Sequence, residues 1–211
     1  MKLSVLIGDL VRSRKVPDRE TVQRRLKMSL EKVNRTYRSS ILAPLIITRG
    51  DEFEGALKDA AACFKAFRDI ENDLFPVQVR GGIGIGAIDT DFSKLVSEMD
   101  GPAFHLAREA LKSAGRKSCL CLKTGDEKID CSLNLLLRLY WAVKGGWTRR
   151  QREVANFYLS HSNLTHAEIA RHFGVSQPAI SKVISAANLQ LIKEAEELLA
   201  QCLSEIKSAC S

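Results

Sequence analysis

The sequence has no run of about eighteen apolar residues, the length that a helix needs to cross a bilayer, so no membrane span is expected. We also expect no secretory leader, because the apolar run at residues 3–7 is too short and Asp9 soon follows it. No low-complexity run or internal repeat is visible. These absences predict a cytoplasmic protein.

The six cysteines form no Cys-x-x-Cys pair, the spacing typical of many zinc and redox sites. Cys119 and Cys121 are separated by one residue, which suits a strand with both thiols on one face. We interpret the cysteines as small buried hydrophobes in a reducing cytosol, with a zinc site or a disulfide framework as the weaker alternative.

The composition is that of a globular protein with a basic charge balance. Hydrophobic residues make up 45% and charged residues 27% of the 211 positions, enough for one substantial core and a small second domain. The formal net charge of +7 permits contact with nucleic acid without proving it.

The first part of the chain alternates strand and helix signals. The order β-α-β-β-α-β, followed by α-β, predicts an α+β fold, ferredoxin-like with one extra unit, in which helices cover one face of a largely antiparallel sheet. The helices are those capped by Asp18 and Asp59 and a third over residues 101–114. The strands are expected at residues 3–8, 45–49, 52–57, 77–88 and 118–123.

Glycines occupy every second position from Gly82 to Gly86, on one face of the fourth expected strand. Such a stripe marks the close approach of a backbone or of a ligand, so tight packing and a bound nucleotide both account for it. Arg80, beside this face, is expected to hold a phosphate or to pair with Glu52 or Glu54.

The second part of the chain predicts only helices. Residues 124–127 look like a boundary, so we expect one domain over residues 1–128 and a helical domain over residues 129–211. Apolar residues of the last helix, over about residues 188–206, exceed what one small domain needs. They suit either the core alone or the core together with a dimer contact.

Three consecutive helices in this second part have clear start and stop signals. Thr148 and Thr165 each begin a capping box, Gly174 suits a left-handed helix end, and Ser176 can cap the third helix. This spacing is typical of a helix-turn-helix, in which Ala170 forms the tight contact and Ile180 the core. The other inward positions are Ile169, Phe173, Val175 and Val183. The alternative is a helical hairpin that only packs on a neighbour.

The outward residues of this motif suit DNA. Glutamine can pair with adenine, serine with several bases, and lysine with guanine or phosphate, while arginines near the start of the preceding helix, Arg152 among them, suit phosphates. The segment resembles the helix-turn-helix of LuxR-type regulators and of sigma-factor DNA-binding regions. The expected DNA-binding residues are Arg149, Arg150, Ser176, Gln177, Pro178, Ser181 and Lys182.

Acidic residues stand at two places that a ferredoxin-like sheet brings together. Asp9 ends the first strand, and Asp51 and Glu52 lie at the tip of the expected hairpin. Two carboxylates there can share divalent cations, which favour oxygen ligands and nucleotide phosphates. The alternative is that Asp9 and Asp51 are turn residues or members of surface ion pairs.

Three segments carry a family resemblance. Residues 50–53 (GDEF) resemble the hairpin of diguanylate cyclases, and residues 80–86 (RGGIGIG) and 100–108 (DGPAFHLAR) resemble class III nucleotidyl cyclases. Nearly end to end, the chain resembles the SatD family, a cyclase-like domain joined to a helix-turn-helix. The resemblance implies that Asp9 and Asp51 bind metal, with Mg²⁺ as the cofactor. The nucleotide-binding residues that we expect are Arg80, Gly82, Gly84, His105 and Arg108.

The chain departs from the cyclase pattern at three positions. The lysine that reads the base falls on Ile47, and the asparagine that orients the ribose falls on His105, for which an ordinary packed or solvated histidine is the alternative. The arginine that supports transition-state charge falls on Glu109, with Arg108 one position early, a slip of about 100° around a helix.

These observations predict a transcription regulator that binds double-stranded DNA as a homodimer and whose cyclase-like domain binds a nucleotide or acts as a dimerising scaffold. The enzymatic alternative is a Mg²⁺-dependent nucleotidyl cyclase, or a related phosphoryl-transfer enzyme, with a DNA-binding tail. A third alternative, a purely structural dimerisation module, predicts no ligand.

Overall fold

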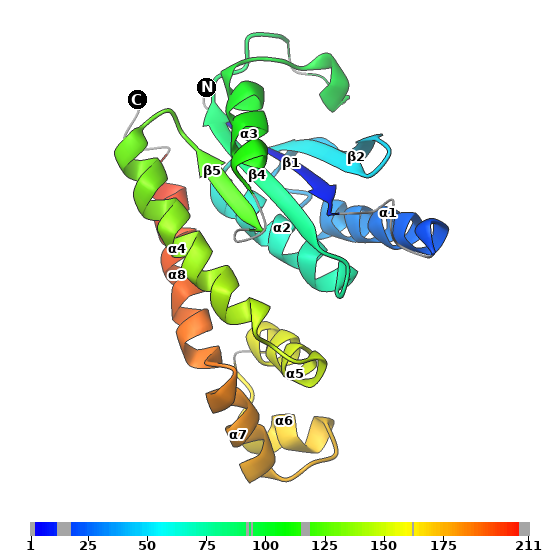
Figure 1. The fold of residues 1–211 in the computed structure, drawn as a ribbon, viewed down its shortest axis with the longest axis vertical. Coiled ribbons are helices and arrows are strands. Elements are labelled where there is room, and N and C mark those ends of the chain that lie inside the picture. The colour runs from blue at the N-terminus through cyan, green and yellow to red at the C-terminus, as the bar shows by residue number, and fades with distance from the viewer. Residues whose placement is uncertain are drawn as a thin grey trace. The chain divides into compact units, whose positions relative to one another are not determined.

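The computed structural model describes residues 3–11, 18–91, 93, 95–114, 119–161 and 163–206 (Figure 1). Two compact units are present: one consists of the described residues of Met1–Arg138 and Leu199–Ser211, the other of those in Leu139–Leu198. The helices α4 (Glu127–Gly145) and α8 (Leu189–Glu205) contribute residues to both units. The expected boundary after residue 128 stays a prediction. Within the described residues, no helix combines the length and apolarity that crossing a membrane requires.

The first unit is built on a five-stranded sheet with the strand order β2-β3-β1-β4-β5. The pairs β2–β3, β3–β1 and β1–β4 are antiparallel, and β5 runs parallel to β4. This mixed sheet with its helices confirms the expected α+β class, and the order of the first four strands is the ferredoxin-like one. The strands are β1 (Leu3–Leu10), β2 (Ile41–Arg49), β3 (Glu52–Leu57), β4 (Val79–Gly86) and β5 (Leu120–Lys123).

Strand β2 begins at Ile41, earlier than the expected start at residue 45, and therefore includes Pro44. Proline has no amide hydrogen to donate, so in sheets it is confined to edge strands and bulges. β2 lies at the edge of this sheet, and its pairing with β3 shifts register between Ala43 and Ile46. The edge position and the irregular pairing together accommodate the proline.

Helices cover both faces of the sheet, which corrects the expectation of one covered face. Phe67 of α2 lies against Gly81, whereas the backbone of α3 lies against Gly82. Because neighbouring residues of a strand point to opposite faces, α2 and α3 cover different faces. Helix α1 packs beside α2, and the short helix η2 contacts β2 and β3. The helices are α1 (Arg19–Thr36), α2 (Ala60–Leu74), η2 (Val96–Glu98) and α3 (Pro102–Ser113).

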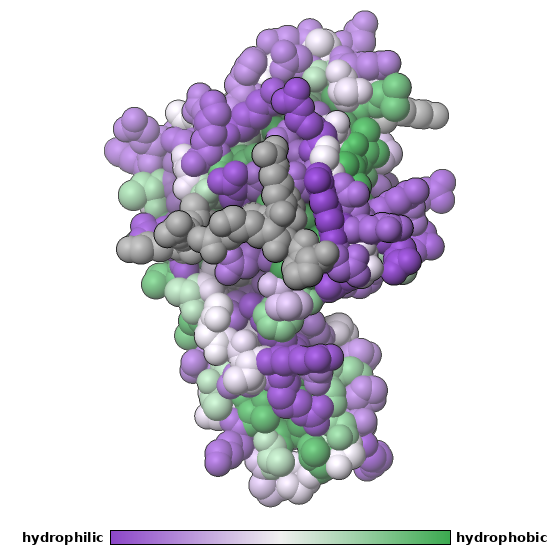
Figure 2. Space-filling view, turned by 45° about the vertical axis from the view of Figure 1, so that its right-hand side comes forward, coloured by the Kyte–Doolittle hydropathy of each residue, from purple (hydrophilic) through white to green (hydrophobic). Residues whose placement is uncertain are grey.

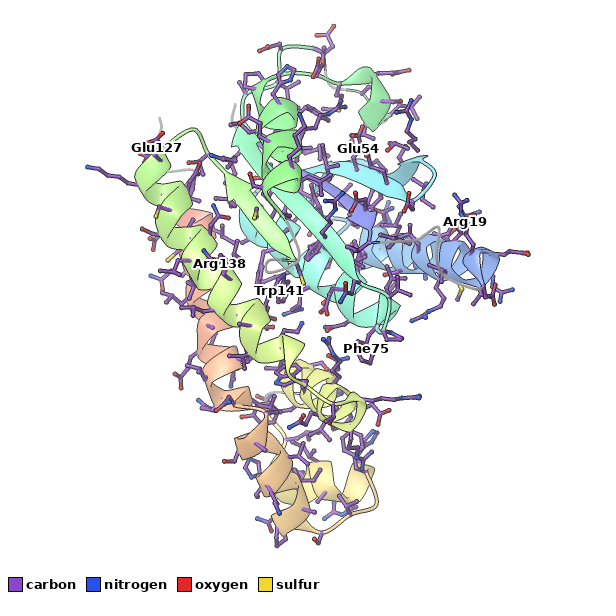
Figure 3. All side chains as sticks on the ribbon, in the orientation of Figure 1. Arg19, Glu54, Phe75, Glu127, Arg138 and Trp141 are labelled. Carbon is purple, nitrogen blue, oxygen red and sulfur yellow. The ribbon has the colours of Figure 1, made fainter. Side chains whose placement is uncertain are left out.

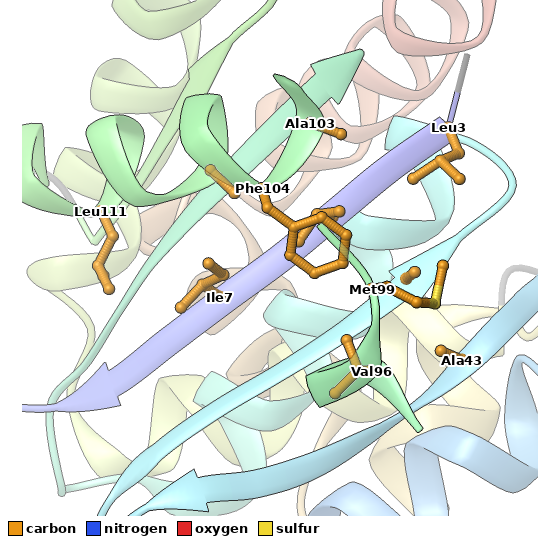
Figure 4. Packing of buried hydrophobic residues seen from close by; sticks show 11 residues of the cluster. Leu3, Ile7, Ala43, Val96, Met99, Ala103, Phe104 and Leu111 are labelled. Atoms are coloured by element: carbon orange, nitrogen blue, oxygen red, sulfur yellow. The ribbon is translucent and has the colours of Figure 1, made fainter. Parts of the chain in front are cut away.

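The face under α3 has a continuous apolar core (Figure 4). Phe104 of α3 packs in one cluster with Ile7 of β1, Val96 of η2 and Met99, all of them buried. Burial on both faces explains why β1 is mostly apolar and does not alternate regularly with polar residues; even its Ser4 is buried. Hydrophilic side chains cover most of the face shown in Figure 2, and apolar ones form smaller groups there.

The second unit is built from helices, and both expected capping boxes are present. The Thr148 hydroxyl accepts a hydrogen bond from the Gln151 amide at 3.2 Å, and the Gln151 side chain accepts one from the Thr148 amide at 2.8 Å. Thr165 and Glu168 form the same reciprocal pair. Besides parts of α4 and α8, the unit contains α5 (Arg149–Ser160), α6 (His166–His172) and α7 (Gln177–Ala186).

Aromatic residues stabilise this second unit. The buried Trp147 donates its indole N–H to the carbonyl of Ala187 at 2.9 Å. The Tyr140 hydroxyl donates to Glu196 at 2.5 Å and so connects α4 with α8. Lys144 is a buried residue, only 2% exposed, and its ammonium nitrogen lies 4.6 Å from the ring centre of Trp141. A cation held against aromatic rings in this way is partly compensated for its lost hydration.

Candidate functional site

Strands β1 and β4 bring Asp9 and Arg80 together. The two residues are direct neighbours in the strand register, so both side chains lie on the α3 side of the sheet. Arg80 donates from Nε to Asp9 Oδ1 at 2.6 Å and from Nη2 to Oδ2 at 2.7 Å, which makes a two-pronged pair. From the sequence we expected Arg80 to bind a phosphate or to pair with Glu52 or Glu54. In the structure its partner is Asp9.

Asp51 lies in the turn at the tip of the β2–β3 hairpin, where Gly50 has a left-handed φ of 63°. The hydrogen bonds with Asp9 raise the pKa of Arg80, burial opposes the rise, and the charges of Asp9 and Asp51 add to it. The two expected metal ligands thus act on one guanidinium. Across the described ranges, no three His, Cys, Asp or Glu side chains gather closely enough to hold a metal ion.

Glu54 is a buried carboxyl group that the sequence did not single out as a site residue. Glu54 lies on β3, where Figure 3 labels it. It stands opposite Ile7 of β1 and is 5% exposed. Its Oε2 lies 3.9 Å from Nη2 of Arg108. Burial raises the pKa of Glu54, the charge of Arg108 lowers it, and those of Glu52 and Asp100 raise it. The sequence signal is an acidic residue in the middle of a strand, where a buried carboxylate requires a partner.

His105 and Arg108 lie on the exposed side of α3. His105 Nε2 is 3.9 Å from Asp100 Oδ1, and both side chains are mostly exposed. The contact is an ion pair only when the imidazole is protonated. Arg108 extends to Glu54. The expected contact of His105 and Arg108 with a nucleotide stays a prediction.

The glycine stripe of β4 is packed against α3. A Cβ atom on Gly82 would overlap the carbonyl oxygen of Ala107 and the amide nitrogen of Leu111. One on Gly84 would overlap backbone atoms of Ala103 and Ala107. Tight packing, one of the two explanations that the sequence left open, therefore accounts for the stripe. The other explanation was a bound nucleotide, and the backbone of α3 occupies the space over Gly82 and Gly84 that it would need.

A second group of expected site residues surrounds the α6–α7 turn. Gly174 has a φ of 63°, and the amide of Val175 donates to the carbonyl of Ala170 at 3.0 Å, which closes the turn. Ile169, Ala170 and Ile180 are buried, as expected. Val175 is 39% exposed, which corrects its expected inward position, because it stands in the turn itself.

The outward side of α7 carries exposed polar residues at its N-terminal end. Gln177, Pro178 and Lys182 are exposed, and Ser176 precedes them as an exposed N-cap residue whose side chain makes no capping hydrogen bond. Ser181 is half-buried, and its hydroxyl lies 3.1 Å from Nδ1 of His166 in α6. Ser181 therefore contacts a neighbouring helix. We expected its side chain to face the solvent fully, and it does not.

The arginines of α5 differ in their surroundings. Arg149 is 87% exposed and pairs with Glu153 at 3.3 Å. Arg150 is also exposed, and its guanidinium lies 4.7 Å from the ring centre of Phe173. Arg152 donates to a backbone carbonyl at the end of α4 at 3.3 Å and is half-buried, so its geometry differs from that of the exposed phosphate contact that we expected.

Solved structures with a similar fold include three nucleotidyl cyclases. A bacterial light-regulated adenylyl cyclase has a TM-score of 0.44 at 13% identity, over 57% of this chain and 74% of its own. The catalytic core of a rhodopsin-guanylyl cyclase in complex with ATPαS has a TM-score of 0.40 at 15% identity, over 53% of this chain and 72% of its own. The guanylyl cyclase Cya2 has a TM-score of 0.39 at 13% identity, over 58% of this chain and 74% of its own.

A comparison with curated proteins found no match. A family match, by contrast, covers nearly the whole chain, including the strand ends that carry Asp9 and Arg80 and the helices around Gly174. Because residues 3–200 match the SatD family, the chain belongs to that family.

Proposed function

We propose that this protein is a transcription regulator that reads double-stranded DNA with α7. The contrast between two sides of the α6–α7 pair carries the proposal. Ala170 and Ile180 are buried between the helices, whereas Gln177 and Lys182 lie exposed on the other side. A helix that presents polar and basic side chains at its N-terminal end suits the major groove of DNA.

The surroundings of α7 support DNA over a protein neighbour. A helical hairpin that only packed on another protein surface would expose an apolar stripe, and the first exposed residues of α7, Gln177 and Pro178, do not form one. Basic residues outnumber acidic ones over α5–α7, which favours contact with phosphates. The charged residues of these helices are Arg149, Arg150, Arg152, Arg171 and Lys182 against Glu153 and Glu168.

We further propose that the protein acts as a homodimer, since paired half-sites multiply affinity and specificity. Leu135 and Leu139 on α4, and Leu191 and Leu198 on α8, are exposed large apolar residues that a partner copy would cover. The first unit would then set the distance between two DNA-reading helices, either as a scaffold or in response to a nucleotide with a different affinity for each arrangement.

The enzymatic alternative is a Mg²⁺-dependent nucleotidyl cyclase or a related phosphoryl-transfer enzyme, and the cyclase-like fold of the solved neighbours favours it. A nucleotidyl cyclase would need the carboxylates of Asp9 and Asp51 open to Mg²⁺, and both oxygens of Asp9 are bound to Arg80. Incubation of the full chain with ATP or GTP and Mg²⁺, followed by chromatography of the products, tests this alternative. We expect no cyclic nucleotide, and a steady yield of one would replace the regulator proposal with the enzymatic one.

The DNA proposal is tested by selecting duplexes from a pool with a randomised central segment, using the full chain. Fluorescence anisotropy then compares the selected duplex with a scrambled one. We expect Gln177→Ala to lose about 1–3 kcal/mol of affinity for the selected duplex and to relax its preference at one base pair. We expect Arg150→Ala to weaken both duplexes alike and to flatten the salt dependence.

Lys182→Ala and Lys65→Ala form a matched pair, because each removes one positive charge from an exposed helical position, on α7 and on α2 respectively. Lys182→Ala should weaken binding, and Lys65→Ala should bind as the wild type does. If no duplex is enriched, or if the two lysine variants bind equally well, α7 does not read DNA.

A further inference from the structure

On the α3 side of the sheet, two carboxylates each have an arginine partner. Asp9 is bound by Arg80 through two hydrogen bonds, and Glu54 has Arg108 at 3.9 Å. The family resemblance implies a different arrangement, in which Asp9 and Asp51 hold a divalent cation. Such an ion requires carboxylate oxygens that it can approach to about 2.1 Å.

The geometry of the Asp9–Arg80 pair does not fit that requirement. Oδ1 of Asp9 accepts from Nε at 2.6 Å and Oδ2 accepts from Nη2 at 2.7 Å, so the guanidinium is engaged by both oxygens. A two-pronged pair of this kind sets the orientation of the carboxylate as well as its distance. A divalent ion on either oxygen would sit next to the guanidinium, where two positive charges repel each other strongly.

The surroundings of Arg80 keep it at this place. Its backbone belongs to β4, which is paired with β1 on one side and with β5 on the other. Its Cα stands directly opposite that of Asp9. The side chain is 39% exposed, less than that of Arg108 at 62%. The register of β1 and β3, in which Gly8 stands opposite Phe53, brings the hairpin turn with Asp51 to the same end of β1. A metal ion on Asp9 would compete with both hydrogen bonds from an arginine whose Cα the sheet places directly opposite.

We propose that Arg80 is the resident cation of this acidic site, so that its guanidinium compensates Asp9 and Asp51 in place of a divalent metal and this site takes up no Mg²⁺. The proposal does not depend on DNA binding by α7, since it concerns only the first unit. It has a direct consequence. Once the guanidinium is removed, the two carboxylates lose their counter-charge and become able to share a divalent ion.

The test titrates the full chain with Mn²⁺ alone, as a paramagnetic substitute for Mg²⁺, and measures the free ion by electron paramagnetic resonance. Five proteins are compared: the wild type, Arg80→Ala, Arg80→Gln, the double variant Asp9→Asn/Arg80→Ala, and Arg68→Ala. The last is the matched control, because it removes an arginine from another Arg–Asp pair of the same unit, with Asp69 at 2.9 Å. Circular dichroism verifies the fold of each variant.

We expect the wild type and Arg68→Ala to bind no Mn²⁺ beyond weak surface association. Arg80→Ala and Arg80→Gln should bind one ion at least about tenfold more tightly, and the double variant should lose this binding. Mn²⁺ binding by the wild type that Mg²⁺ displaces and that the Asp9→Asn/Arg80→Ala variant lacks would overturn the proposal. The same holds if both folded Arg80 variants leave the ion free. If Arg80→Ala does not fold, the comparison of Mn²⁺ binding between Arg80→Gln and the wild type tests the proposal.

Discussion

The close packing of β4 on α3 predicts opposite outcomes for two glycine-to-alanine substitutions. A methyl group on Gly84 would overlap the carbonyl oxygen of Ala103 and the amide nitrogen of Ala107, both in the backbone of α3. A methyl group on Gly145, at the end of α4, would meet no atom within 4 Å. Because a helix backbone cannot yield at one atom, Gly84→Ala must push α3 away from the sheet.

The magnitude follows from the cost of overpacking, about 1–3 kcal/mol, and from a sensitivity of roughly 2–4 °C in Tm per kcal/mol at this chain length. We expect Gly84→Ala to lower the Tm by about 2–12 °C. Gly145→Ala should leave the Tm unchanged or raise it slightly, because alanine is the better helix former. Thermal unfolding followed by circular dichroism measures both variants against the wild type.

Gly86→Ala is an intermediate case, because its Cβ would lie 3.0 Å from the amide nitrogen of Ala103. A Tm between those of Gly84→Ala and Gly145→Ala is expected. Equal Tm values for Gly84→Ala and Gly145→Ala would show that α3 does not press on β4. The glycine stripe would then again need a ligand to explain it.

Three further predictions concern single residues. Burial raises the pKa of Glu54, so the folded state disfavours the charged carboxylate. Glu54→Gln should therefore become more stable than the wild type as the pH rises above 4.5, the ordinary pKa of a glutamate. A gain in stability that does not grow with pH, or that the exposed control Glu31→Gln shares, would contradict this. Thr148→Ala removes the cap of α5 and should cost about 1 kcal/mol in urea unfolding, whereas Thr148→Ser should retain most of the stability; equal loss in both would exclude the cap as the cause. Gly174→Ala should lose about 1 kcal/mol of unfolding free energy, measured by calorimetry, because Gly174 has a left-handed φ of 63°. Gly174→Asn should lose less, and an equal loss in both variants would show that the turn changes its conformation.

The features that depend on neighbours along the chain could be predicted from the sequence. The capping boxes of Thr148 and Thr165 each join residues three positions apart, and both are present. The left-handed turn at Gly174 needs only a residue without a Cβ at the end of a helix. In each case the chemical reason and the partner lie within one turn of helix.

The features that depend on distant partners could not be predicted in the same way. Arg80 and Asp9 are 71 positions apart, and the chemistry of an arginine suits a phosphate, a glutamate or an aspartate equally well. Likewise, Ser181 is outward on its own helix, and only the packing of α6 brings His166 to it. The second covered face of the sheet was missed because an apolar run does not reveal how many faces it buries.

The Asp9–Arg80 pair has a consequence for how the sheet assembles. Residues 82–86 of β4 repeat glycine and isoleucine with a period of two, so sliding this strand past β1 by two residues would put like side chains in like places. Glycine-rich strands specify their alignment weakly for this reason. The same slide would move Arg80 from Asp9 to a place opposite Ile7 or Val11 and leave both charges without a partner. The ion pair at the strand end thus adds to the packing of Gly81 on Phe67 in distinguishing the native alignment from its nearest competitor.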